Sequence, residues 1–228
     1  MEFRFERDMA PLVCEWLTSN LLAAKQEFVT PWGICDLVGV RLSQNRIRKR
    51  LALGQTKPIG PLDRIRLLQS IPDKGSGESV TLTRLQRRFQ SVFSAQRMVD
   101  EVETLVATRF AEFTTRGTVH RLNGWEPLQR RIVAVELKLA RPHEAFSQAV
   151  SHLAFADEAF VALPLSTAQR LADGPRSREF SRLGVGILGV NKLGCRLLQR
   201  PTGRHFKVDP ALQMLCVERF WRTASYRH

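Results

Sequence analysis

The sequence predicts an α/β protein whose mixed central sheet is flanked by helices and whose chain is interrupted by a separate helical unit. Two runs of apolar, largely β-branched residues, 34–40 and 131–139, are typical of buried strands. Two further apolar runs, 159–163 and 185–190, alternate with stretches of helical periodicity, which favours a sheet covered by helices. Residues 61–122 lack such runs and are predicted to be an insertion.

The other elements of the main domain follow from periodicity and turn residues. Apolar side chains recur at three- and four-residue steps over 3–22, which predicts an amphipathic helix. Residues 194–199 are expected to pair with the strand at 185–190. Further helices are expected over 143–156, over 166–183 with a break near Gly174-Pro175, and over 210–222.

The insertion has the element order of a winged helix-turn-helix, which is three helices followed by a β-hairpin. The helices are predicted at 62–71, 81–89 and 95–111, with Ser94 as the N-cap of the third. A strand pair is expected within 113–122, and Asn123-Gly124 is a hairpin turn signal. The predicted domains are therefore 1–57 with 123–228, and the insert 58–122.

The net charge indicates a polyanionic partner. The 228 residues include 35 Lys and Arg against 22 Asp and Glu, a formal net charge of +13. Arginine dominates the basic set, and its planar fork binds two phosphate oxygens at once. DNA is the preferred partner, ahead of an anionic membrane or a merely solvated basic surface.

The sequence gives no sign of a membrane segment. No apolar run reaches the length of about 18 residues that a span requires, and the N-terminal residues are charged. We therefore expect a cytoplasmic protein without a membrane span. The four cysteines include no C-x-x-C pair and are expected to be buried reduced thiols, and the five histidines are dispersed, so neither residue type signals a zinc site.

Two acidic residues stand inside the apolar strands, Asp36 in the first and Glu136 in the second. Burying an unpaired carboxylate is costly, so each needs a partner, either a metal ion or a buried arginine. Side chains alternate along a strand, so Glu136 and Lys138 share a face. Two carboxylates suit Mg²⁺, which can activate water, and a neighbouring lysine can orient or deprotonate that water.

With these residues the sequence resembles the PD-(D/E)xK nuclease superfamily, which has a restriction-endonuclease-like fold. The resemblance rests on Gly33-Ile34-Cys35-Asp36-Leu37-Val38 and Val135-Glu136-Leu137-Lys138, with the following helix adding Gln148-Ala149-Val150-Ser151-His152. It covers residues 1–57 and 125 to about 200. It implies a Mg²⁺-dependent DNA endonuclease, with Mn²⁺ as an alternative ion, whose catalytic residues are Asp36, Glu136, Lys138, Glu6 and Gln148.

Members of the superfamily often carry a further acid on the first helix, and this acid would join Asp36 and Glu136 as a metal ligand. Glu6 is the better match and Glu15 the competitor. The alternative is that both are ordinary helix charges that face the solvent. Asp36 and Glu136 are 100 residues apart, where most members have a short connection. The insertion explains this departure. Asp63, Asp73 and Asp100 lie in the insert outside apolar strands, so Asp36 is preferred.

The insert carries the candidate DNA-reading residues. Its third helix would enter the major groove, the second would hold phosphates, and the hairpin would form the wing. Protein–protein contact is the alternative role of this unit. The Arg-rich stretch 41–50 is either a further backbone contact or a solvated loop. The DNA-binding candidates are Arg84, Arg87 and Arg88 on the second helix, Ser94, Gln96, Arg97 and Glu101 on the third, and Arg116, His120 and Arg121 around the wing.

Three functions fit the sequence. The first is a metal-dependent DNA endonuclease with its own DNA reader, and the second is a catalytically silent protein of the same fold that only binds DNA. The third is a winged-helix regulator with an α/β assembly domain. Double-strand cutting by a protein with one site normally needs a homodimer or a partner protein, so either is expected with the first function.

Overall fold

The computed structural model describes residues 3–31, 33–201 and 208–224, and the chain divides into two compact units. The first unit comprises Met1–Arg41 with Arg130–Asp209, and the second Leu42–Gln129 with Pro210–His228. The predicted insert, 58–122, lies within the second unit. That unit also takes in 42–57, 123–129 and the last helix, which the sequence had placed with the main domain.

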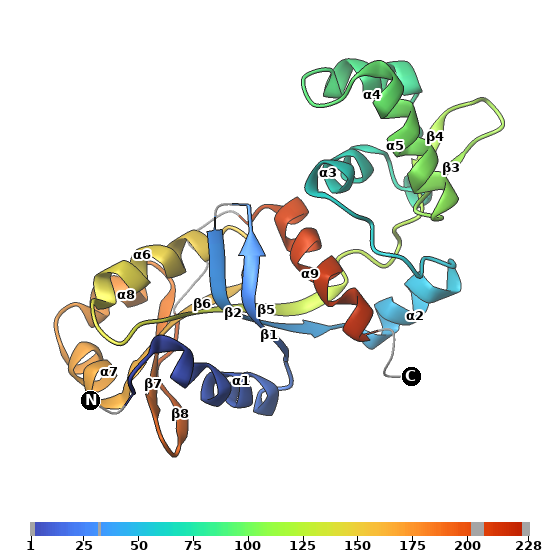
Figure 1. Cartoon of the computed structure of the whole chain (residues 1–228). Helices are drawn as coiled ribbons and strands as arrows, with labels where there is room; N and C mark the ends of the chain where they lie inside the picture. The colour runs from blue at the N-terminus through green and yellow to red at the C-terminus, as the bar shows by residue number, and fades with distance from the viewer. Residues whose placement is uncertain (1–2, 32, 202–207, 225–228) are drawn as a thin grey trace. The chain divides into compact units, whose positions relative to one another are not determined.

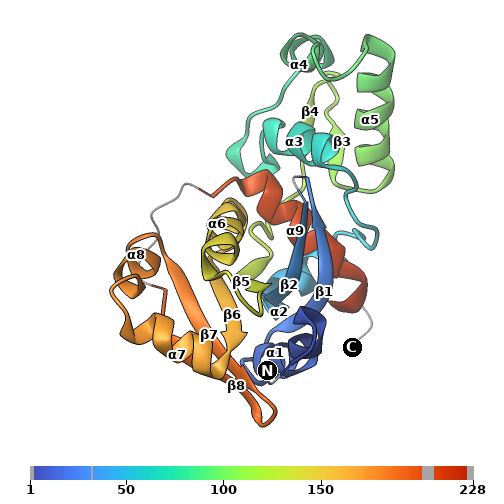
Figure 2. The same ribbon diagram turned by 60° about the vertical axis from the view of Figure 1, so that its left-hand side comes forward.

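The first unit is built on a six-stranded mixed sheet with the order β1-β2-β5-β6-β7-β8 (Figure 2). The central strands β5, β6 and β7 are parallel, whereas β1 pairs with β2 and β8 with β7 in antiparallel fashion. The mixed α/β architecture predicted from the sequence is confirmed. The strands span Ala23–Thr30 (β1), Gly33–Leu42 (β2), Gln129–Leu137 (β5), Glu158–Pro164 (β6), Val185–Asn191 (β7) and Gly194–Gln199 (β8).

Helices cover both faces of this sheet, with α1 and α6 on opposite sides (Figure 1). Alternation along β6 separates the two cores, because Phe160 and Ala162 face α1 whereas Val161 and Leu163 face the other helices. The predicted break near Gly174 is confirmed, since that helix ends at Asp173. The helices are α1 (Ala10–Ser19), α6 (Pro142–His152), α7 (Leu165–Asp173) and α8 (Ser177–Arg182).

The N-terminal segment begins with a short 3₁₀ helix, η1 (Glu6–Met9), that runs directly into α1. The carboxylate of Asp8 accepts hydrogen bonds from the backbone amides of Arg4 and Phe5, at 3.2 and 2.7 Å, and closes this turn. Met9 is fully buried under the sheet. The helix predicted over 3–22 is therefore shorter, because α1 spans Ala10–Ser19 and is preceded by the 3₁₀ helix, and Met9 anchors its start in the core.

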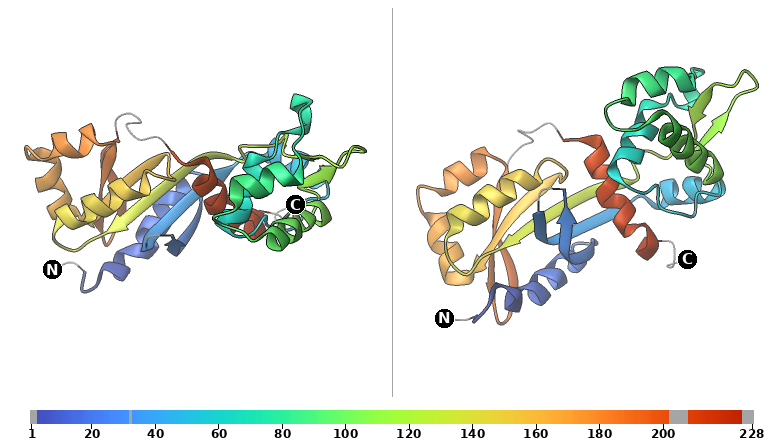
Figure 3. Two further views of the ribbon diagram at one scale, coloured as in Figure 1. Left: turned by 90° about the horizontal axis from the view of Figure 1, so that it is seen from above. Right: turned by 45° about the horizontal axis from the view of Figure 1, so that its top comes forward.

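The second unit contains three helices followed by a two-stranded hairpin, in the predicted order (Figure 3). Thr81 and Ser94 cap the second and third of these helices, accepting from Arg84 N and Arg97 N at 3.2 and 3.3 Å. The N-cap expected at Ser94 is thus confirmed. The elements are α2 (Gln44–Ala52), α3 (Leu62–Ser70), η2 (Lys74–Ser76), α4 (Leu82–Phe89), α5 (Ala95–Ala107), β3 (Ala111–Phe113), β4 (Val119–Arg121) and α9 (Pro210–Ala224).

The strand pair expected within 113–122 is confirmed and turns at Thr114–Thr118, whereas Asn123-Gly124 does not form a hairpin turn. Gly117 has a φ of 71°, the left-handed conformation that the turn requires. The amide of Thr114 donates to the carbonyl of Thr118 at 2.7 Å. Asn123 is instead buried, beyond the end of β4, so the local dipeptide signal was overridden by packing.

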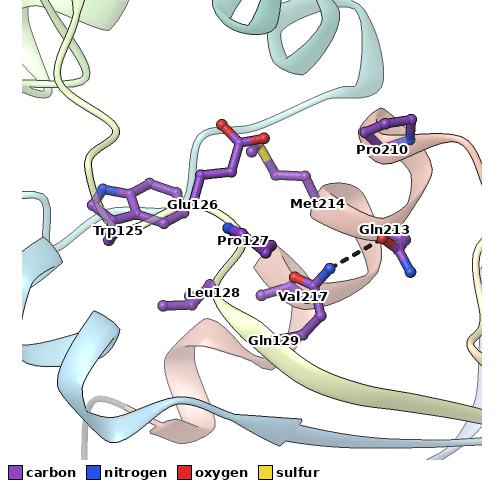
Figure 4. A pocket seen from close by; sticks show the side chains of 9 residues that line it. All are labelled: Trp125, Glu126, Pro127, Leu128, Gln129, Pro210, Gln213, Met214 and Val217. Carbon is purple, nitrogen blue, oxygen red and sulfur yellow. Dashed lines mark hydrogen bonds between the residues drawn. The ribbon is translucent and has the colours of Figure 1, made fainter. Parts of the chain in front are cut away.

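The last helix, α9, packs on the segment 125–129 within the second unit, and a small pocket lies between them (Figure 4). Gln129 Nε2 donates to Gln213 Oε1 at 3.1 Å across this contact. A bidentate ion pair joins Arg50 of α2 to Glu218 of α9, which explains why α2 and α9 belong to this unit. The pocket walls are mainly apolar and bring no chemically reactive pair together.

Candidate functional site

Asp36 meets the end of strand β5 through a backbone hydrogen bond. Its Oδ2 accepts from the amide of Leu137 at 2.7 Å. That amide lies between Glu136 and Lys138, so the carboxylate of Asp36 sits at the Glu-x-Lys segment although it comes from β2, 100 residues earlier. Strand β2 is the direct neighbour of β5 in the sheet, which accounts for the encounter.

Glu6 also reaches the end of β5, and with Asp36, Glu136 and Lys138 it forms what we call the acidic cluster. Its carboxylate lies 3.2 Å from Lys138 Nζ and accepts from the amide of Leu139 at 3.4 Å. The side chain of Lys138 is 18% exposed, which leaves its ammonium group partly accessible. The structure therefore brings Glu6 to the strand end, while Glu15 is exposed on α1.

The electrostatic environment of Asp36 is that of a cluster with excess negative charge. Burial is the main reason why the pKa of Asp36 rises from 3.8 to about 6, and the nearby carboxylates of Glu136 and Glu6 raise it further. The Leu137 amide and the Lys138 ammonium lower this pKa but do not compensate for burial. The ionised form of Asp36 is therefore disfavoured mainly by burial and, to a smaller extent, by the neighbouring carboxylates.

Glu136 lies deeper than an open metal cleft would place it. It is 2% exposed, and its Oε2 lies 3.1 Å from Nε2 of the equally buried His152 on α6. The thiol of Cys35, on β2, is the third member of this group, and one donor atom from each residue lies within 4.8 Å of the others. We call Cys35, Glu136 and His152 the buried triad.

Gln148 and His152 are four residues apart on α6, yet they have different environments. The helix buries Ala145, Ala149 and His152, and the side chain of Gln148 is exposed. It is therefore His152 that reaches Glu136. The sequence had identified His152 only as part of the helix that follows the Glu-x-Lys strand.

The carboxylates around the end of β5 suit a hard divalent cation. Asp36, Glu6 and Glu136 supply oxygen donors, the type that Mg²⁺ prefers, and a cation would offset the charge that raises the Asp36 pKa. Glu136 would have to exchange its contact with His152 for that role. These three residues are the candidate ligands, with Lys138 beside them, but in the described part of the chain their oxygens are not gathered within 4.8 Å of one another, as the donor atoms of the buried triad are.

The basic residues predicted to read DNA lie in the second unit and fall into two groups. Arg84, Arg87 and Arg88 on α4, Gln96 and Arg97 on α5, and Arg116 in the hairpin turn are exposed. Arg121 instead pairs with Glu126 at 3.3 Å, and His120 lies 2.6 Å from Glu112. Glu101, expected to face bases, is buried against Arg64, so that expectation was wrong.

The Arg-rich stretch 41–50 is neither a loop nor wholly solvated. Residues 44–52 form α2, and Arg50 is fully buried within the second unit. Its guanidinium pairs with Glu218 and stacks over the rings of Trp221 and Trp125, at 3.8 and 4.9 Å from their centroids. Arg50 is therefore not a DNA contact.

The fold and the site together define a mixed α/β protein with an acidic cluster at the end of a central parallel strand. No protein-family model and no curated protein matches the chain. A solved structure with partial likeness is the SPO1766 protein of unknown function from Silicibacter pomeroyi, at 12% identity and a TM-score of 0.45 over 100% of this chain and 90% of that one. Within the described residues, no helix is both long and apolar enough to cross a membrane.

Proposed function

We propose that this protein is a metal-dependent DNA endonuclease whose first unit has the restriction-endonuclease-like fold. The observation that carries the proposal is the hydrogen bond from Leu137 N to Asp36. It brings the acidic residue of β2 to the Glu-x-Lys segment of β5, although the two segments are far apart in the sequence. The contact of Lys138 with Glu6 supports it, because it adds a third carboxylate at the same strand end.

Each residue of the cluster has a defined role in this proposal. Asp36, Glu136 and Glu6 would hold Mg²⁺ or Mn²⁺, which supplies Lewis-acid stabilisation of the phosphodiester and an activated water. Lys138 would orient the attacking water or remove its proton, and its charge would offset the negative charge that develops on the phosphate. Gln148, exposed on α6, would contribute at most a substrate contact.

A cleavage assay tests the proposal. Supercoiled plasmid and linear duplex should be cut with Mg²⁺ or Mn²⁺ and left intact with EDTA. Glu136→Gln and Lys138→Ala should each lower the rate by roughly 10²–10⁴-fold, because each removes a group acting on the reacting phosphate. Glu158→Gln is the matched control, since Glu158 pairs with Arg131 on the same sheet outside the cluster. DNA left intact with every metal, or equal cutting by all variants, would reject the nuclease.

We also propose that the second unit is a winged-helix DNA reader, with α5 as the recognition helix. The order α3-α4-α5-β3-β4 supports this, as does the exposure of Arg84, Arg87 and Arg88 along α4. Arg84 and Arg88 also line a pocket with the hydroxyl groups of Ser70 and Ser79, and the two guanidinium charges outweigh the one carboxylate there, that of Glu78. Such a surface suits phosphate oxygens.

Salt dependence of DNA affinity tests the reader. For Arg84→Gln/Arg88→Gln, the slope of log affinity against log salt should become shallower by about 2, because each lost phosphate contact releases one fewer counterion. Arg170→Gln, an exposed arginine on α7 of the first unit, is the matched control and should leave the slope unchanged. An unchanged slope in the double variant would remove α4 from the DNA-binding surface. Fluorescence anisotropy on a short duplex gives the measurement.

A DNA-binding protein without nuclease activity is the second candidate function. The burial of Glu136 against His152 favours it, because a carboxylate engaged in this way is less available to a hard cation. DNA binding without cleavage under every metal condition would be its signature.

A further inference from the structure

We propose that the buried triad of Cys35, Glu136 and His152 is a second metal site, one that selects a borderline-soft divalent ion of the Zn²⁺ class. A thiolate sulfur, an imidazole nitrogen and a carboxylate oxygen make up the donor set that Zn²⁺ accepts, whereas Mg²⁺ avoids sulfur. The site therefore differs in chemistry from the oxygen cluster formed by Asp36 and Glu6.

The geometry of the triad needs little change to accept an ion. Its donor atoms lie within 4.8 Å of one another, and tetrahedral bonds of about 2.0–2.3 Å place ligand atoms roughly 3.5 Å apart. Glu136 Oε2 and His152 Nε2, 3.1 Å apart, already lie close to this separation. Three protein ligands leave a fourth position for water, as in open zinc sites.

The hydrogen bonding of His152 is compatible with a metal ligand role. His152 is 3% exposed, and its Nδ1 has no hydrogen-bond partner among the described residues. The other ring nitrogen, Nε2, lies 3.1 Å from Glu136 Oε2 and is the one that would bind an ion at the triad. Because Nδ1 has no fixed partner among the described residues, the imidazole can carry its proton on Nδ1 and leave the Nε2 lone pair free for the ion.

The charge balance permits a divalent ion in this buried position. The Cys35 thiolate and the Glu136 carboxylate together neutralise two positive charges, and the imidazole stays neutral, so the loaded site carries no net charge. On binding, the thiol passes its proton to the solvent and a sulfur–metal bond forms without a change of oxidation state.

Occupation of the triad would compete with the proposed nuclease site, since both use Glu136. An ion bound by Cys35 and His152 would hold this carboxylate away from Mg²⁺, and cleavage would be inhibited. This consequence rests on the proposed function, whereas the site itself does not.

Cobalt absorption tests the site directly. Metal-free full-length protein equilibrated with Co²⁺, or refolded in its presence, should develop a thiolate-to-cobalt charge-transfer band that saturates at about one ion per chain and is displaced by Zn²⁺. Cys35→Ser should abolish the band. His152→Asn should weaken Co²⁺ binding by more than about tenfold, because even second-shell changes cost that much. Cys195→Ser is the thiol control and should keep the band, with circular dichroism confirming that each variant folds.

The outcomes separate this site from the nuclease proposal. No band under either condition, or a band that survives in Cys35→Ser, would overturn the site whether or not the protein cuts DNA. If the band forms as described, stoichiometric Zn²⁺ should inhibit Mg²⁺-dependent cleavage by the wild type and by Cys195→Ser. It should not inhibit cleavage by Cys35→Ser, which lacks the site. A band without such inhibition would leave the site standing and reject its regulatory consequence.

Discussion

Asp36→Asn is expected to abolish metal-dependent cleavage while making the protein more stable at pH 8. The asparagine carbonyl can still accept from the Leu137 amide, but the substitution removes a charge that burial and two neighbouring carboxylates disfavour. The loss of attraction to Lys138 offsets part of the gain, and solvent screens this half-buried group. We therefore expect about 1 kcal/mol, a rise of about 2–4 °C in melting temperature.

The stability gain should depend on pH in a defined direction. The pKa of Asp36 is about 6 in the folded protein against 3.8 as the ordinary value, so folded wild type binds the proton more tightly than the unfolded chain. Its stability therefore falls as pH rises through this interval and levels off above about pH 6. The advantage of Asp36→Asn should be largest at pH 8 and should shrink toward pH 4.

Thermal melts at several pH values and a plasmid-cleavage assay measure both effects. The cleavage rate of Asp36→Asn should fall by roughly 10²–10⁴-fold. Asp157→Asn is the matched control, because the Asp157 carboxylate accepts from Ile132 N at 2.8 Å, a similar contact with strand β5 outside the cluster. It should retain cleavage without gaining stability. A less stable Asp36→Asn protein at pH 8, or one that still cuts, would contradict the assigned environment of Asp36.

Elements with a strong local pattern were predictable from the sequence. The apolar strands around Asp36 and Glu136 occur where they were expected, as do the helix break near Gly174 and the cap at Ser94. Each of these features depends on residues that are close together in the sequence. The strand pair within 113–122 was also predictable, whereas the separate turn signal of Asn123-Gly124 was not realised, because Asn123 is buried.

Contacts between distant segments were not predictable in the same way. Alternation along the predicted strand 131–139 placed Glu136 and Lys138 on one face, but β5 ends at Leu137, and the pattern could not show that His152, from the next helix, buries Glu136. Cys35 was read as an inert buried thiol because its spacing to other cysteines carries no signal. Only the packing of β2 and α6 around β5 brings its sulfur near an acid and an imidazole.

Arg50 shows the same limit in the second unit. Five basic residues within 41–50 form a composition typical of a solvated or DNA-contacting segment, and nothing local distinguishes Arg50 from the others. Its partner Glu218 lies 168 residues later. The pair is recognised only once α2 and α9 are adjacent.

Breaking the Arg50–Glu218 pair is the substitution expected to cost the most stability. The two side chains are 0% and 3% exposed, and Glu218 also accepts from the amide of Ile59 at 2.7 Å. Arg50 in turn donates to the carbonyl of Lys57 at 3.0 Å. Glu218→Gln removes the charge that compensates a buried guanidinium, and we expect a loss of about 3–5 kcal/mol.

Denaturant unfolding followed by tryptophan fluorescence measures this loss, because Trp125 and Trp221 both contact the Arg50 guanidinium. Glu144→Gln serves as the control. Glu144 pairs with Arg141 at 2.9 Å, but both side chains are more than half exposed, so the change should stay within about 1 kcal/mol. Similar losses for the two variants would mean that burial does not set the strength of the Arg50 pair.

A double variant distinguishes attraction within the pair from the cost of an orphaned charge. Arg50→Met/Glu218→Leu removes both charges and fills the site with apolar atoms, so it should be clearly more stable than Glu218→Gln alone. The aromatic rings of Trp125 and Trp221 would pack against the methionine as they do against the arginine. If the double variant lost as much stability as Glu218→Gln, the hydrogen bonds of this pair to Ile59 and Lys57, rather than charge compensation, would hold α2 and α9 together.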